Sequence, residues 1–299
     1  MLHKIRPYMM PAAMILGGLF CNYLEPLAVF TPCLIFTMLL LTYFNLSLKD
    51  IRFSRAHFLM LAIQIFGSIA VYFLLQPINI VLAQAAMICV LAPTATSAPV
   101  IARILKGNVE SLTAYSLLCN TMVVIAAPIV FSFAGSYKEM LFFESFLLIA
   151  RQIALLLITP FVLAIVIRRL LPVVCTKVHL FSNISFFLWV FALMVVTAKI
   201  VKFILMQNAN NYQLEILIAG CSMIICFAQF WLGRKIGRKY DDTVSGGQGL
   251  GQKNTVLAIW MAQTYLSPIS SLGPGMYVLW QNMVNSYQVW RQREKKVKK

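Results

Sequence analysis

Charge is scarce in this chain, and negative charge is the scarcest. Only 11% of the 299 residues are charged, whereas 61% are hydrophobic. An ordinary soluble domain is about 25% charged and about 45–50% apolar. Of the charged residues, 25 are Lys or Arg and only 9 are Asp or Glu. This composition excludes an ordinary soluble domain and predicts an integral, polytopic membrane protein.

The histidines and cysteines of the chain lack the spacing that metal binding or redox chemistry requires. The three histidines have no Cys or carboxylate at ligand spacing, and the seven cysteines form no C-x-x-C pair. No cluster of carboxylates or histidines lies within an apolar segment, as an intramembrane enzyme such as a lipid-diphosphate transferase would require. We therefore expect no metal site, no cofactor and no enzymatic activity.

Long apolar runs fill most of the chain. A membrane span needs about 20 mostly apolar residues. Ten segments fit this requirement, with short loops between them and no separate soluble domain: about 8–26, 28–48, 57–76, 78–105, 110–134, 142–167, 180–204, 213–233, 245–266 and 272–290. The sequence predicts ten transmembrane helices in an all-α protein.

Basic residues divide unequally between the loops. If the ten spans alternate, one side of the membrane collects 20 Lys and Arg residues and the other side only 3. Cytoplasmic loops carry the excess of Lys and Arg, so both termini are expected in the cytoplasm. The expected location of the protein is a bacterial inner (plasma) membrane. Because the formal charge of +16 sits in these loops, the bilayer is the expected partner and nucleic acid is not.

Two apolar segments are interrupted by residues that break helices. The first interruption is 93–99, with a proline at each end, and the second is the glycine-rich stretch 246–255. Non-helical backbone at bilayer depth occurs only where protein buries it or water reaches it, and paired interruptions mark the binding site of many transporters. Lys253, in the second interruption, is costly at that depth and is therefore a candidate functional residue. The glycines are interpreted as the hinge that breaks the second helix.

The two halves of the chain echo one another. Similar residues recur after an offset that drifts slowly, and each half holds five spans, so the second copy must be inverted in the membrane. We expect one repeat over 1–138 and the other over 139–299. The matching pairs are Pro11 and Pro160, Pro99 and Asn254, and Asn120 and Asn282.

At the two interruptions the sequence resembles the bile acid:sodium symporter family. The stretch Ala92-Pro93-x-x-Thr96, followed by Lys106-Gly107-Asn108-Val109, is similar to the family pattern A-P-G-G-T-A-S-N…R-G-N-V, and 251–258 is similar to E-V-G-M-Q-N-S-G-L-A. The resemblance implies an inverted five-plus-five repeat whose broken helices 4 and 9 cross near mid-membrane. It also implies a core domain of spans 3–5 and 8–10, a panel domain of spans 1, 2, 6 and 7, and a substrate site beside the crossing.

The chain departs from this family at the sodium sites. Gln64 matches a sodium-site glutamine, but side chains without a suitable oxygen, or with a positive charge, stand at other ion-site positions: Ala98, Pro99, Leu112, Gly249 and Lys253. Sodium is a hard cation that needs several oxygen ligands. A sodium ion within a few ångströms of the Lys253 ammonium would be repelled by about 4 kcal/mol at an effective dielectric constant of about 20. We expect that sodium coupling is absent.

Lys253 has several possible roles. Its ammonium could replace sodium and tie the two interruptions together, or bind an anionic substrate, or carry a proton, or extend towards the membrane surface. Gln64 could act with it as a coupling residue or form hydrogen bonds in the core. The other candidate residues are expected to line the substrate site or to satisfy unwound backbone at the crossing: Thr96, Ser97, Asn120, Asn254, Thr255 and Asn282.

The expected function is secondary transport of a small organic anion by alternating access, without sodium. Positive charge at the crossing, from Lys253 and from helix N-termini, favours a carboxylate-bearing solute. The alternatives are a non-transporting membrane receptor or partner subunit, and a sodium-coupled symporter of the bile acid type. Substrate identity, transport direction, driving ion and oligomeric state are not determined by the sequence.

Overall fold

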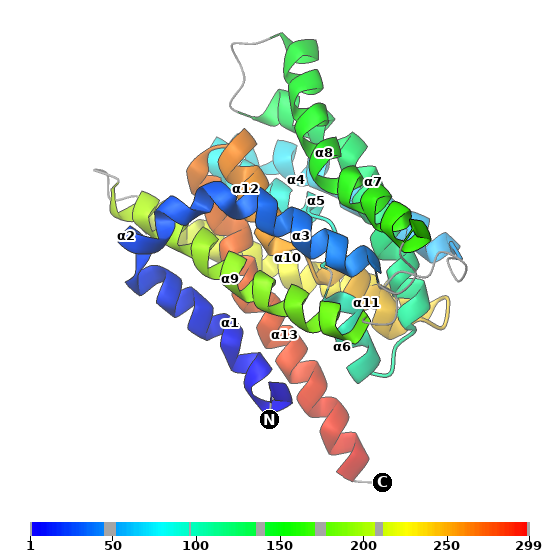
Figure 1. Ribbon diagram of the computed structural model, residues 1–299. Coiled ribbons are helices and arrows are strands. Elements are labelled where there is room, and N and C mark those ends of the chain that lie inside the picture. The colour runs from blue at the N-terminus through cyan, green and yellow to red at the C-terminus, as the bar shows by residue number, and fades with distance from the viewer. Residues whose placement is uncertain are drawn as a thin grey trace. The chain divides into compact units, whose positions relative to one another are not determined.

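The computed structural model describes residues 2–44, 52–95, 97–135, 141–170, 178–206 and 212–297. These residues are helical almost throughout, with no strand among them and one isolated β-bridge (Figure 1). Five helical stretches are long and apolar enough to cross a membrane: Cys21–Phe44, Arg55–Leu75, Val109–Ala134, Phe142–Leu170 and Tyr212–Arg238. The chain is an all-helical membrane protein, as its composition predicts.

The chain folds into two compact units, each assembled from separate stretches of sequence. One unit comprises Met1–Leu48, Val124–Asn210 and Ile259–Ile269. The other comprises Lys49–Val123, Asn211–Ala258 and Ser270–Lys299. The units are called here the first and the second unit.

In the first unit, α9 (Val178–Leu205) packs against most of the other helices. Its neighbours are α1 (Leu2–Leu19), α2 (Cys21–Leu24), η1 (Glu25–Phe30) and α3 (Thr31–Phe44), and α3 also packs against α8 (Phe142–Leu170). Lys202 of α9 donates to Glu25 at 3.0 Å. The predicted boundary between the first two spans, near residue 27, is wrong: α1 ends at Leu19, and α2, η1 and α3 then form one helical stretch over Cys21–Phe44.

The second unit holds both interruptions. Its helices are α4 (Arg55–Leu75), α5 (Ile80–Leu91), α6 (Ala98–Ile104), the first part of α7 (Val109–Ala134), α10 (Tyr212–Arg238), α11 (Thr243–Gly251), the start of α12 (Thr255–Tyr265) and α13 (Leu272–Val297). Polar side chains fix several helix starts, because a free helix N-terminus has unpaired N–H groups. Asn79 accepts from Val81 and Leu82 at the start of α5, and Asn254 accepts from Leu257 in α12.

Glycines bring α10 and α11 into backbone contact. A Cβ on Gly233 of α10 would lie 2.2 Å from the Gly246 carbonyl oxygen of α11, and a Cβ on Gly246 would lie 2.4 Å from the Gly233 oxygen. Such small residues allow membrane helices to approach closely. The glycine-rich stretch therefore packs as continuous helix through Gly251, and the break lies after it, at 252–254. The glycines are therefore not themselves unwound, and their role as the hinge stays a prediction.

Candidate site at the contact between the two helix breaks

The two helix breaks meet through a pair of backbone hydrogen bonds. Thr94, between α5 and α6, forms an antiparallel bridge with Lys253, between α11 and α12. The Asn254 N–H donates to the Pro93 oxygen at 2.8 Å, and the Ala95 N–H donates to the Gln252 oxygen at 2.9 Å. Each break thus satisfies backbone groups that the other has left unpaired, which is a condition for unwound backbone at bilayer depth.

The carbonyl groups at the C-terminal end of α5 receive donors from three other elements. Gln229 donates to the Cys89 oxygen at 3.2 Å, and the Lys253 Nζ donates to the Val90 oxygen at 3.0 Å. Gln64 donates to the Leu91 and Ala92 oxygens at 2.7 and 3.0 Å. A helix C-terminus carries a partial negative charge of about half a unit, so these donors, one of them cationic, stabilise the end of α5.

Lys253 is one of the most deeply buried side chains in the protein, with 1% of its surface exposed. Among the described residues no carboxylate lies within 4.0 Å of its ammonium. Its backbone N–H is also held, by the Gln281 oxygen at 3.0 Å. This geometry favours the interpretation in which the ammonium acts as a fixed cation on the end of α5.

The C-terminal end of α11 is satisfied by hydroxyl groups instead. The Thr94 hydroxyl donates to the Gly249 oxygen, and the Tyr277 hydroxyl donates to the Gly251 oxygen, both at 2.7 Å. Tyr277 also accepts from Gln229 at 3.1 Å. The two broken helices therefore end against donors of different charge.

Aromatic and apolar side chains fill the space around Gly249. A Cβ at this position would lie 2.8 Å from Cδ1 of Tyr115 and 3.3 Å from Cδ1 of Leu112. The same apolar cluster includes Ala98 and Leu250. The resemblance would place the shared sodium-site glutamate here, and the local packing leaves no room for a carboxylate or its ion.

Gln64 is fully buried beside this cluster. Its amide nitrogen holds the end of α5, and its oxygen accepts from the Tyr115 hydroxyl at 3.0 Å and from the Cys119 thiol at 3.1 Å. Both the nitrogen and the oxygen of its side-chain amide therefore have partners in the protein. The contacts favour a core hydrogen-bonding role for Gln64.

Several polar atoms near the breaks have no described partner. Gln252 donates to the Ser97 hydroxyl at 2.9 Å, but its own oxygen is buried and unpaired, as is the Thr255 hydroxyl. Asn120 of α7 donates to the Ser116 oxygen at 2.7 Å and also has an unpaired oxygen. Buried polar groups are normally paired, so these atoms are candidates for contact with a bound solute or water.

The predicted site residues divide into three groups. Gln64, Ser97, Lys253, Asn254 and Thr255 lie at the contact between the breaks or next to it. Asn120 and Asn282 lie on α7 and α13, and no described hydrogen bond joins either side chain to the crossing. Thr96 lies outside the described residues.

Other residues of the site were not predicted from the sequence. They are Thr94, Gln229, Gln252 and Tyr277. The available signal was an amide or hydroxyl group within an otherwise apolar segment, but many such groups lie elsewhere in the chain. Which of them reach the breaks is decided by tertiary packing.

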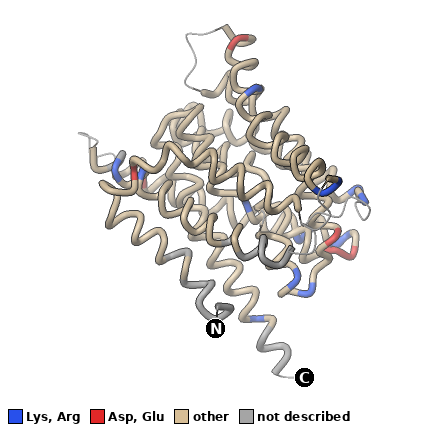
Figure 2. The backbone as a smooth tube through the Cα atoms, viewed as in Figure 1, with Lys and Arg blue, Asp and Glu red and all other residues tan. Residues whose placement is uncertain are grey.

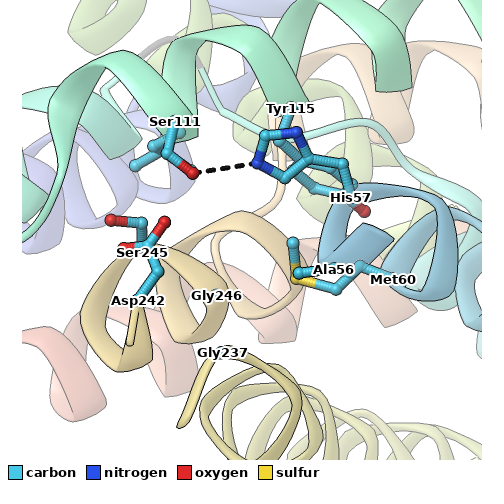
Figure 3. A pocket seen from close by; sticks show the side chains of 10 residues that line it. Ala56, His57, Met60, Ser111, Tyr115, Gly237, Asp242, Ser245 and Gly246 are labelled. Atoms are coloured by element: carbon cyan, nitrogen blue, oxygen red, sulfur yellow. Dashed lines mark hydrogen bonds between the residues drawn. The ribbon is translucent and has the colours of Figure 1, made fainter. Parts of the chain in front are cut away.

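A small cavity elsewhere in the second unit is lined by His57, Ser111, Asp242 and Ser245 (Figure 3). It has a volume of about 10 Å³, room for about one water molecule. The Ser54 N–H donates to Nδ1 of His57 at 3.3 Å, so the proton of the neutral ring is on Nε2 and donates to Ser111 at 2.9 Å. The described residues contain no group of three metal-ligating side chains. The hydrogen bond between His57 and Ser111 fixes the start of α4 against α7.

No protein-family model matches the chain, and no curated protein matches it.

Proposed function

We propose that this protein is a secondary transporter that moves a small organic anion by alternating access without sodium. The observation that carries the proposal is the Lys253 ammonium, which is buried where the two helix breaks meet and donates to the end of α5. Paired breaks at one point are typical of transporter binding sites. A fixed ammonium at that point supplies the positive charge that a coupling cation would otherwise bring.

The proposed substrate class follows from the charge at the crossing. Lys253 brings a positive charge, and no described carboxylate lies within ion-pair distance of it. A buried charge without a counter-ion is costly, so an anion that enters beside the crossing is stabilised there. A carboxylate also fits the N-terminal end of α12, where the helix dipole is positive. The unpaired Gln252 oxygen can accept from a hydroxyl group of the same solute, and the unpaired Thr255 hydroxyl can donate to its carboxylate.

The absence of sodium coupling is part of the proposal. It is supported by the Tyr115 ring and the Leu112 side chain, which pack on Gly249 where the resemblance would place an ion ligand. It is supported further by the Lys253 ammonium, which would repel a neighbouring sodium ion.

The proposed architecture is that of the bile acid:sodium symporter family, of which the chain would be a divergent member. It consists of ten spans in an inverted five-plus-five repeat, with repeats over 1–138 and 139–299 and both termini in the cytoplasm. The second unit contains most of the residues assigned to the core domain, although the later parts of spans 5 and 9 belong to the first unit, which also contains the spans assigned to the panel. That division supports the motion of one unit against the other that alternating access requires.

The topology is tested by labelling single introduced cysteines from one side of the membrane. Positions near Arg52, Lys106 and Lys239 are expected to label only from the cytoplasm. Positions near Lys138 and Asn210 are expected to label only from outside. Labelling of both groups from the same side would contradict the ten-span arrangement.

Function is tested with the purified full chain. A thermal-shift screen against organic carboxylates, in choline buffer, is expected to identify acids that raise the melting temperature. The acid with the largest shift is then used, radiolabelled, in uptake into proteoliposomes, with protein-free vesicles as the control. Stabilisation without uptake would indicate a membrane receptor or partner subunit instead. If no carboxylate stabilises the protein, the proposed substrate class is wrong.

A further inference from the structure

A second feature of the second unit lies towards the C-terminal ends of α10 and α13, two helices that pack against each other. Three arginines lie near these ends: Arg234 and Arg238, one helical turn apart on α10, and Arg291 on α13. Figure 2 shows the described Lys and Arg residues in blue along the backbone. Arg234 lies within electrostatic range of both others. Like charges at short range repel one another, so this arrangement needs an explanation beyond the need for basic loops.

The three guanidinium groups have no negative partner in the part of the chain that the structure describes. No described ion pair or hydrogen bond involves any of them. Asp241 and Asp242, which follow Arg238 in sequence, line another cavity, with Lys106 and Asn108, and the side chain of Glu294, three residues after Arg291, lies outside the described ones. Within the part of the chain that the structure describes, the three arginines are therefore available to an anion from outside the protein.

Arg234 is held in place rather than free in solvent. It is partly buried, and its aliphatic stem lies on Gly247 of α11, where a Cβ would come within 2.5 Å of the arginine Cγ. A side chain fixed in this way loses less entropy on binding, and the planar guanidinium group suits the oxygen atoms of a phosphate.

Aromatic rings place this cluster at the depth of lipid headgroups. Trp231 is exposed three residues before Arg234, and the Lys235 ammonium lies 4.8 Å from the centre of its ring. Tyr287 and Trp290 are exposed just before Arg291, with ring centres 5.9 Å apart. Exposed Trp and Tyr residues of membrane helices sit at the interface between the acyl chains and water, so the adjacent arginines reach the level of the phosphates.

We propose that Arg234, Arg238 and Arg291 form a binding site for the phosphate headgroup of an anionic phospholipid. The aromatic rings of Trp231, Tyr287 and Trp290 lie along the upper part of the acyl chains. Because the Arg234 stem rests on Gly247, a bound lipid braces α10 and α13 against α11, the half-helix that leads into the second break. This proposal depends on neither the substrate nor the transport activity.

The test is lipid binding to the delipidated full chain in neutral detergent, measured by native mass spectrometry. Phosphatidylglycerol and phosphatidylcholine with identical acyl chains are compared. Basic residues near a membrane surface each contribute about fivefold to the affinity for anionic lipid, so three arginines predict a preference of about 100-fold for phosphatidylglycerol. Equal binding of the two lipids would overturn the proposal.

Two triple variants separate a site from diffuse positive charge. R234Q/R238Q/R291Q is expected to lose the preference. R103Q/R168Q/R169Q, which removes three arginines from other helix ends, is expected to keep it. Equal loss in both variants would show that net charge alone attracts the lipid.

A lysine variant and competition by inorganic phosphate provide two further measurements. If the glutamine variant does not fold, as judged by gel filtration, R234K/R238K/R291K replaces it. The lysine variant is expected to prefer phosphatidylglycerol less strongly than the wild type does, but still to prefer it over phosphatidylcholine. A preference as strong as that of the wild type would overturn an arginine-specific site. Free inorganic phosphate is expected not to displace the lipid. Full displacement would show a site for soluble anions instead.

Discussion

In the second unit, α5 and α11 both end at the contact between the two helix breaks, but different donor groups stabilise the two ends. The end of α5 receives an ammonium from Lys253 and an amide from Gln64, whereas the end of α11 receives hydroxyl groups from Thr94 and Tyr277. Both solutions satisfy carbonyl groups that unwinding has exposed. Backbone satisfaction alone therefore does not require a charge. The charge at the end of α5 needs a second reason, which we propose is the electrostatic environment of the substrate.

The largest effect is expected from removing the ammonium. Lys253→Met should lower the free energy of unfolding by about 1.5–3 kcal/mol, because a charge-assisted hydrogen bond to a buried carbonyl is lost. Lys253→Arg, which keeps the charge, should cost less. Denaturation in detergent measures both.

The matched control for Lys253→Met is Lys202→Met. Lys202 is a partly exposed lysine that pairs with Glu25, and exposed pairs contribute about 0–1 kcal/mol. Should Lys253→Met be as stable as the wild type, the ammonium does not hold the end of α5, and the contrast between the two breaks disappears.

A comparable effect is expected at the contact between α10 and α11. Gly233→Ala should destabilise the protein by about 1–3 kcal/mol, because the new methyl group overlaps the Gly246 backbone and overpacking forces a shift. Gly220→Ala on the same helix meets nothing within 4 Å and should stabilise by up to about 1 kcal/mol through higher helix propensity. Thermal unfolding of the two variants checks the difference in sign. A Gly233→Ala variant as stable as Gly220→Ala would contradict the close packing of α10 against α11.

Smaller effects are expected from removing the hydroxyl groups that donate to the end of α11. Tyr277→Phe and Thr94→Val should each cost about 0.5–1.5 kcal/mol, the usual contribution of a neutral hydrogen bond. Tyr287→Phe, an exposed tyrosine on the same helix as Tyr277, should change stability by less than about 0.5 kcal/mol. Chemical denaturation gives all three values. A loss in Tyr277→Phe as large as that in Lys253→Met would show that the two breaks depend on their donors equally.

The positions of the two breaks could be predicted from the sequence because they depend on local chemistry. Pro93 and Pro99 interrupt the first helix, and Lys253 marks the second interruption by its charge within an apolar segment. The contact between the breaks follows from the resemblance and is present as the bridge between Thr94 and Lys253.

The rest of the site depends on tertiary packing and could not be predicted. The glycines of α11 have the composition of a hinge, but Gly246 lies against Gly233 of another helix, and only that contact explains its small size. The Tyr115 ring fills the space at Gly249 from a helix more than a hundred residues earlier in the chain. The cavity at His57 similarly combines residues from α4, α7, α10 and α11. Side chains from distant segments meet there without a pattern in the sequence.

The most direct test of the central claim is uptake of the stabilising carboxylate into proteoliposomes in sodium buffer and in choline buffer of equal ionic strength. If the Lys253 ammonium takes the place of a coupling cation, the two initial rates should be equal, and Lys253→Met should reduce both by the same factor. The carboxylate should also raise the melting temperature equally in the two buffers. A saturable, several-fold stimulation of wild-type uptake by sodium would show that an ion site exists at the crossing and would contradict this account.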